Sequence, residues 1–275
     1  HMNINSLKKK CQDLRLKNLD ICYKSGGHIS TCLSTVEILV AIYYSSIFKF
    51  NPKKPKDSNR DYFILSKGHG CEIVYLILAD LGFYSNDYFN NNYRKNNFDF
   101  AGHINSKVNG VEFSSGSLGH GLGFGSGIAL SNKFKKNNLK TIVLMGDAEC
   151  TAGSVWEAAN FCSFNNLNNI LTVVDFNKIG ATENISSFSD PKLLEKKWVS
   201  FGWNVINVED GNDLNSLIKA YKKFVNNKNK PTVILANTIK GKGIKMLEND
   251  PIWHTKQIDN TNYEKALKDL KNSFK

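Results

Sequence analysis

The second half of the chain alternates strand-like and helix-like segments, and this alternation limits the possible folds more than any other feature. Continuous apolar runs occur at residues 141–145, 170–176, 204–208 and 232–238. Segments with helical periodicity separate them at 154–164, 191–201 and 213–225. Such runs, spaced by amphipathic helices, are typical of a parallel sheet covered on both sides. The sequence therefore predicts an α/β fold: a parallel sheet flanked by helices on both faces.

The first half of the chain is predicted to be mainly helical. Residues 4–24, 34–48 and 71–83 have the spacing of amphipathic or buried helices. The polar stretches 51–61 and 86–99 are interpreted as connections within one unit. We expect a single domain over residues 3–275, with His1 and Met2 interpreted as a cloning remnant.

Composition excludes several classes of function. The formal charge of +11 suggests a polyanion as ligand, but the chain has only three arginines, and its lysines are scattered among asparagines. We therefore expect no nucleic-acid partner. No apolar run reaches the roughly 18 residues of a membrane helix, and no secretory signal is recognisable at the start. Six cysteines without a CxxC pair indicate reduced thiols in a cytoplasmic protein.

Two polar side chains stand where predicted core strands end. Asp147 follows the strand-like run "TIVLMG", and Asn177 follows "ILTVVDF" thirty residues later. A right-handed crossover of this length brings both strand ends to one edge of the sheet, where ligands of such folds bind. A carboxylate, an amide oxygen and a nearby carbonyl suit Mg²⁺. Taken singly, Asp147 is explained equally well as a helix N-cap and Asn177 as a turn residue. The two residues together favour a site for a metal and a diphosphate.

Five segments in order resemble the N-terminal half of transketolase. "GDAE", with Asn177 thirty residues after its Asp, is similar to the motif of thiamine-diphosphate (ThDP) enzymes. "SGGHISTCLSTVEILVAIYY", "NRDYFILSKGHG", "FAGHINSKVNGVEFSSGSLGHGLGFGSGIAL" and "TIKGKGIKMLENDPIWH" resemble the histidine and glycine segments of transketolase. The resemblance covers nearly the whole chain. It implies the ThDP-binding fold and a transketolase-type transferase that uses ThDP and Mg²⁺.

The resemblance also implies roles for individual residues. Asp147, Asn177 and the carbonyl of Ile179 would bind the metal. The residues implied to bind ThDP are His69, Gly116, Ser117, Leu118, Gly146, Asp147, Ala148, Glu149, Asn177 and His254. The residues implied to be catalytic are His28, His69, His103 and His254. His28 and His103 would contact sugar hydroxyls. His69 and His254 would lie near the diphosphate and the reacting carbon. His120 is expected outside this inner set.

The histidines support this interpretation from the residues alone. Apart from His1 there are five, and four of them directly follow a glycine. A single histidine is more often structural, but five in glycine-flanked loops are harder to explain in that way. Loop histidines with pKa values near neutrality are suited to proton transfer and to binding hydroxyl groups.

The resemblance further implies a partner. Transketolases activate the cofactor with a glutamate from a pyrimidine-binding domain, and this chain stops about where the diphosphate-binding domain ends. We expect a separate C-terminal subunit that supplies the glutamate and forms a heterotetramer with this chain. The expected reaction transfers a two-carbon ketol unit from a ketose, or its phosphate, to an aldose or its phosphate.

Three positions depart from the family pattern, and alternatives remain open. Ala148 replaces the usual Gly, Ile29 stands where Pro is common, and Ala152 occupies a position often held by Glu. The stretch "CTAG" resembles deoxyxylulose-phosphate synthase, so a synthase or acyl-transfer enzyme is the second hypothesis. A ThDP-binding scaffold with little activity is the third. A nicotinamide-binding domain is disfavoured because the Gly-rich segment has the wrong spacing and follows no predicted strand.

Overall fold

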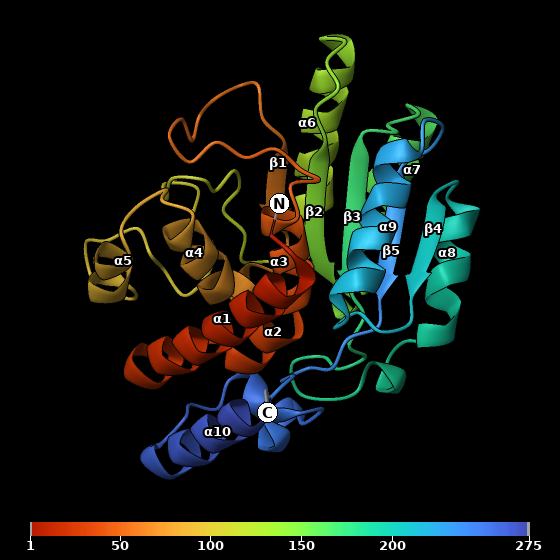
Figure 1. The fold of residues 1–275 in the computed structure, drawn as a ribbon. Coiled ribbons are helices and arrows are strands. Elements are labelled where there is room, and N and C mark those ends of the chain that lie inside the picture. The colour runs from red at the N-terminus through yellow and green to blue at the C-terminus, as the bar shows by residue number, and fades with distance from the viewer. Residues whose placement is uncertain (1, 274–275) are drawn as a thin grey trace.

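The computed structural model describes residues 2–273 and contains one five-stranded parallel sheet (Figure 1). Its strands are β1 (Tyr62–Leu65), β2 (Thr141–Gly146), β3 (Ile170–Asp175), β4 (Asn204–Val208) and β5 (Thr232–Ala236). They lie in the order β1-β2-β3-β5-β4, and every neighbouring pair is parallel. The predicted α/β class is confirmed.

Ten α-helices surround the sheet in the part of the chain that the structure describes. They are α1 (Ile4–Ser25), α2 (Ile29–Ser34), α3 (Val36–Tyr44), α4 (Cys71–Asp80), α5 (Asn86–Asn92), α6 (Gly121–Phe134), α7 (Gly153–Phe164), α8 (Leu194–Ser200), α9 (Leu214–Asn226) and α10 (Asn260–Asn272). In Figure 1, α9 lies across one face of the strands, α1 to α5 lie beside the β1 edge of the sheet, and α10 lies below α1. None of the helices in residues 2–273 has the length and hydropathy of a bilayer-spanning segment.

The side chains of each strand alternate between two hydrophobic cores. Ile142 and Leu144 of β2 belong to a large core with residues of α1, α3, α4 and α9. Val143 and Met145, which alternate with them along the strand, belong to a second core with residues of α6, α7 and α8. Because successive side chains of a strand point to opposite faces, a continuous apolar run buries both of its sides. The predicted cover of helices on both faces is therefore confirmed.

The structure differs from the sequence prediction at three elements. Strand β1 was not predicted, because four residues in a polar context give too little periodicity. The predicted helix 34–48 begins earlier and is broken at Thr35, whose hydroxyl donates to the carbonyl of Cys32 at 3.0 Å. Such local side-chain bonds compete with the helical ladder. Within the polar stretch 86–99 the structure contains helix α5, with Ser85 as its N-cap.

The carboxyl ends of the strands lie along one edge of the sheet. Gly146, the last residue of β2, is in register with Asp175, the last residue of β3. The loops that follow β1, β2, β3 and β5 therefore start side by side. This arrangement positions the candidate site.

Candidate active site

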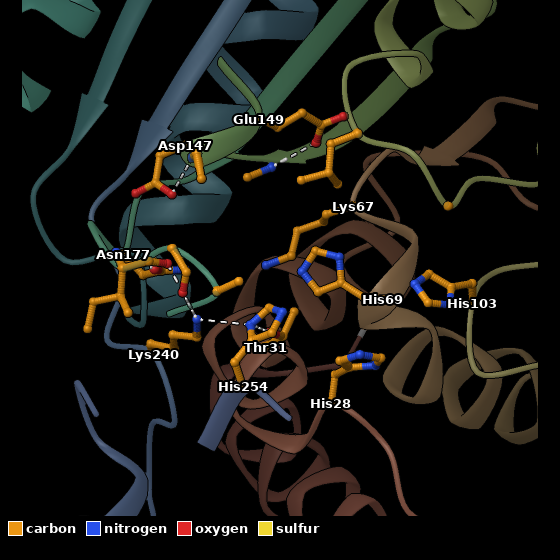
Figure 2. Close-up of a pocket in the computed structure, with 17 residues that line it drawn as sticks. His28, Thr31, Lys67, His69, His103, Asp147, Glu149, Asn177, Lys240 and His254 are labelled. Carbon is orange, nitrogen blue, oxygen red and sulfur yellow. Dashed lines mark hydrogen bonds between the residues drawn. The ribbon is translucent and has the colours of Figure 1, made fainter. Parts of the chain in front are cut away.

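A cavity of about 230 Å³ lies at the carboxyl edge of the sheet. Figure 2 shows the residues that converge on it from the loops after β1, β2, β3 and β5, from the loop between α5 and α6, and from the start of α2. The lining residues are His28, Thr31, Lys67, His69, His103, Gly116, Leu118, Gly146, Asp147, Ala148, Glu149, Asn177, Ile179, Gly180, Ala181, Lys240 and His254. Of the residues predicted from sequence for this site, all but Ser117 line the cavity. His120 also lies outside this lining, at the exposed start of α6.

The predicted metal ligands come from two neighbouring loops. The Asp147 carboxylate accepts the backbone N–H of Ala148 at 2.8 Å and that of Lys178 at 2.5 Å. The side-chain oxygen of Asn177 accepts the N–H of Ile179 at 3.0 Å. The structure therefore brings together the two loops that the strand–helix–strand spacing predicted to meet. Metal binding at these residues stays a prediction.

The charge balance of Asp147 fits a cation. Burial and the nearby Asp175 raise the pKa of Asp147 to about 7, and among the described residues only backbone N–H groups donate to it. No Lys or Arg in residues 2–273 forms an ion pair with this carboxylate, and no three His, Cys, Asp or Glu side chains there are placed to hold a metal. A site with one carboxylate and amide or carbonyl oxygens suits Mg²⁺, which fills its octahedron with water and phosphate oxygens.

Lys67 and Asp175 form a fully buried ion pair beneath the cavity. The ammonium lies 2.5 Å from the Asp175 carboxylate, and the two residues are 108 positions apart in sequence. Asp175 also accepts bonds from Ser34, Thr238 and Asn177. The lysine and these donors together hold the pKa of Asp175 below its ordinary value despite its burial. Sequence analysis missed both members of this pair.

Lys240 places a second buried ammonium beside the cavity. Its Nζ lies 2.6 Å from the carbonyl oxygen of Gly180 and 3.4 Å from that of Ile179. Burial and the positive charge of Lys67 lower the pKa of Lys240 to about 8. Lys240 forms no ion pair with a carboxylate within residues 2–273, so its ammonium is available to an anion at this end of the cavity.

Four histidines form a cluster opposite the predicted metal loops. The His28 ring lies at its centre, with ring centroids 5.6 Å from His69, 5.5 Å from His103 and 5.6 Å from His254. His69 and His254 are 5.0 Å apart. Chain segments far apart in sequence therefore contribute histidines to one wall, as Figure 2 shows. Nδ1 of His28 is buried without a hydrogen-bond partner in the described residues, so it is available to a bound polar group.

The histidines differ electrostatically from the sequence expectation. Burial, followed by the nearby Lys67, lowers the pKa of His69 strongly. Burial and Lys240 lower the pKa of His254 to about 3, and burial also lowers that of His28. These three rings are therefore neutral at pH 7, whereas pKa values near neutrality were expected. Neutral imidazoles can each donate and accept a hydrogen bond, which suits the binding of hydroxyl groups.

Glu149 holds the Gly-rich segment against the end of β2. Its carboxylate accepts the N–H of Gly119 at 2.7 Å, the N–H of Gly146 at 3.2 Å and the hydroxyl of Ser66. Gly119 has a φ of 93°, and an added Cβ there would lie 2.7 Å from the Cβ of Ala152. The tight turn therefore requires glycine. It presents Gly116 and Leu118 to the cavity.

The sequence reasoning missed five lining residues: Thr31, Lys67, Gly180, Ala181 and Lys240. A signal for them was present, because each belongs to a segment that carries a predicted site residue. Lys67 stands two positions before His69, and Lys240 belongs to the segment that ends with His254. Their burial and pairing depend on long-range contacts that the sequence does not display.

Comparison with known proteins agrees with this geometry. Residues 7–271 match the family described as "Transketolase, thiamine diphosphate binding domain". An apulose-4-phosphate transketolase subunit of Actinobacillus succinogenes is 36% identical over 277 residues, covering 98% of this chain and 98% of that protein. Its counterpart from Phocaeicola vulgatus is 33% identical, with 98% and 95% covered. Human transketolase is 32% identical over 97% of this chain but only 42% of its own length.

Solved structures lead to the same family. The crystal structure of transketolase from Campylobacter jejuni superposes with a TM-score of 0.91 at 26% identity, covering 98% of this chain and 43% of that one. The glycines, the histidines and the loops of Asp147 and Asn177 described above therefore lie in a shared fold, and the predicted resemblance is confirmed. The chain belongs to the transketolase family and comprises its thiamine diphosphate-binding domain.

Proposed function

We propose that this chain is the diphosphate-binding subunit of a two-chain transketolase that requires ThDP and Mg²⁺. It would transfer a two-carbon ketol unit from a ketose phosphate to an aldose phosphate. The observation that carries the proposal is the cavity itself, in which one wall of four histidines faces two loops with Asp147 and two buried ammonium groups. One wall suits a polyhydroxylated sugar and the other a diphosphate with its metal.

Each group of residues has a separate task in this proposal. Asp147, Asn177 and the carbonyl of Ile179 would hold Mg²⁺, and the ammonium groups of Lys67 and Lys240 would offset the diphosphate charge. The remaining cofactor-binding residues would enclose the rings of the cofactor: Gly116, Leu118, Gly146, Ala148 and Glu149. When bound, ThDP supplies the electron sink for breaking and forming the carbon–carbon bond.

The histidines would act on the sugar. His28 and His103, whose ring centroids are 5.5 Å apart, would bind substrate hydroxyls. His69 and His254 lie closer to the two lysines and would orient groups at the reacting carbon. The neutral state of His28, His69 and His254 at pH 7 would let each of these rings accept a hydrogen bond from a substrate hydroxyl or donate one to it.

The partner in the proposal is a separate pyrimidine-binding subunit that supplies the activating glutamate. Two relatives described as subunits of an apulose-4-phosphate transketolase are matched over 95% and 98% of their length, whereas human transketolase is matched over 42%. The mouth of the cavity carries Leu118, which is 37% exposed, and α6 exposes Phe124 and Phe134 beyond it. We propose that this apolar face contacts the partner in a heterotetramer. The six buried free thiols agree with a reducing, cytoplasmic location.

The test is reconstitution with a candidate pyrimidine-binding subunit, such as the product of a neighbouring gene. Ketol transfer is measured with ThDP and Mg²⁺ for the chain alone, the mixture, and the mixture with Asp147→Ala. Donors should include common ketose phosphates and apulose 4-phosphate, the sugar in the names of two relatives. Activity only in the mixture, lost with Asp147→Ala, supports the proposal. A stable, ThDP-binding complex without transfer supports the scaffold hypothesis, and pyruvate-dependent CO₂ release supports the synthase hypothesis.

A further inference from the structure

Helix α4 makes direct contact with three of the four histidine-bearing segments. His69 lies in the short 3₁₀ helix Gly68–Gly70, immediately before the first residue of α4. The helix therefore starts with its position fixed relative to that ring. Two side chains on its first turns, Glu72 and Tyr75, are buried and extend the contact to the other segments.

Glu72 binds the segment that carries His28. One carboxylate oxygen accepts the backbone N–H of His28 at 3.1 Å and the hydroxyl of Tyr93 at 2.6 Å. The other oxygen accepts the thiol of Cys32 at 3.2 Å. A Cβ on Gly27 would lie 2.4 Å from the Glu72 oxygen that accepts from His28, so only glycine fits at position 27 beside this carboxylate. A fully buried carboxylate with this many donors is a rigid anchor.

Tyr75 binds the segment that carries His103. Its hydroxyl donates to the carbonyl oxygen of His103 at 3.2 Å and accepts the backbone N–H of Asn105 at 3.0 Å. The residue between them, Ile104, donates its N–H to the carbonyl of Gly68 at 3.0 Å, which ties the same segment to the residue before His69. Glu72 and Tyr75 are three positions apart and therefore lie on one face of the helix.

We propose that Glu72 and Tyr75 are positioning residues, which set the spacing of His28 and His103 around His69 and thereby the affinity for sugar. Neither side chain lines the cavity, so each acts through the backbone of a histidine segment. The inference rests on the proposed function, in which His28 and His103 bind substrate hydroxyls. A shift of about 1 Å in such a group is enough to weaken a hydrogen bond substantially.

The test uses Tyr75→Phe and Glu72→Gln in the reconstituted complex, with Tyr84→Phe as the matched control. The Tyr84 hydroxyl donates to the carbonyl of Tyr75 at 2.9 Å and to no histidine-bearing segment in the described residues, so its loss removes a comparable bond. Tyr75→Phe is expected to raise KM for the sugar about tenfold, since the two hydrogen bonds of the hydroxyl to the His103 segment are lost together with the alignment they give. ThDP affinity and KM in the control should change less than about twofold. Tyr75→Phe alone suffices if Glu72→Gln does not fold.

A double variant separates positioning from a general loss of packing. In a His103→Ala background, Tyr75→Phe should leave KM unchanged, because its effect passes through that ring. An equal KM increase in both backgrounds, or none in the wild type, would overturn the inference. The chain alone gives a second readout: histidine-selective NMR should show the His103 ring signal shifted by Tyr75→Phe and unmoved by Tyr84→Phe. This readout decides the inference even if the pair of subunits shows no ketol transfer.

Discussion

The ammonium of Lys240 lies 3.1 Å from Nδ1 of His254, and the same ammonium contacts the carbonyl of Gly180 in the loop after β3 (Figure 2). A charged lysine can only donate, so Nδ1 accepts and the ring carries its proton on Nε2. This contact fixes the tautomer of a histidine at the cavity and links it to the predicted metal loop. It also means that protonation of His254 would place two positive charges side by side.

The first prediction follows from that pair and concerns pH. The pKa of His254 is lowered from 6.5 to about 3 by burial and Lys240. Between these values the unfolded chain binds a proton that the folded chain does not, so stability is complete above pH 6.5 and falls as the pH decreases toward 3. Partial exposure of the ring makes the loss smaller than the full shift implies.

Thermal unfolding of the chain between pH 4 and pH 7.5 checks this dependence. His254→Gln should lose less stability on acidification than the wild type, because one proton-binding difference is gone. His120→Gln is the control, since that exposed histidine is outside the cavity. Parallel curves for His254→Gln and the wild type would contradict the assigned pKa shift.

The second prediction concerns the metal loop. Asp147→Asn keeps the size of the side chain and removes the only carboxylate predicted to bind Mg²⁺, so Mg²⁺-dependent ThDP binding should weaken by at least about tenfold. Isothermal titration with ThDP and Mg²⁺ measures the change. Asp190→Asn, at an exposed N-cap away from the cavity, should bind like the wild type. Unchanged affinity in Asp147→Asn would show that the metal is held elsewhere.

The third prediction concerns the buried ion pair. Lys67→Met leaves Asp175 as a buried charge without its cation and should lower the free energy of unfolding by about 3–5 kcal/mol. Adding Asp175→Asn should restore part of the loss, because no uncompensated charge remains. Urea unfolding of the single and double variants measures both effects. A double variant less stable than Lys67→Met would instead assign the stability to the bonds of Asp175 with Ser34 and Thr238.

The fourth prediction concerns the departure at Ala148. The family motif has glycine here, but Ala148 is not among the described residues with positive φ, so its methyl group causes no backbone strain. Ala148→Gly should therefore change ThDP affinity less than about twofold and lower stability by about 1 kcal/mol or less. Titration and thermal unfolding check the two parts. A large gain in affinity would mean that the methyl group obstructs the cofactor.

Local sequence was sufficient where periodicity and strand ends carry the information. Strands β2, β3, β4 and β5 were predicted within one or two residues of their ends, because buried parallel strands appear as continuous apolar runs. The meeting of the Asp147 and Asn177 loops followed from the handedness of the crossover between them. The glycine-flanked histidines were recognisable as a set, although their positions in the sequence do not give the distances between their rings.

Tertiary structure decided what depends on contacts between distant segments. Strand β1 has only four residues and is defined by its pairing with β2, some eighty positions later. Lys67 looks like an ordinary surface lysine in sequence, and only folding buries it against Asp175. The same burial sets the histidine pKa values, since desolvation depends on every group packed around a ring. The sequence by itself determined strands β2 to β5 and the polar residues at their ends, whereas the pairing of β1 and the charges and distances of the cavity arise from long-range packing.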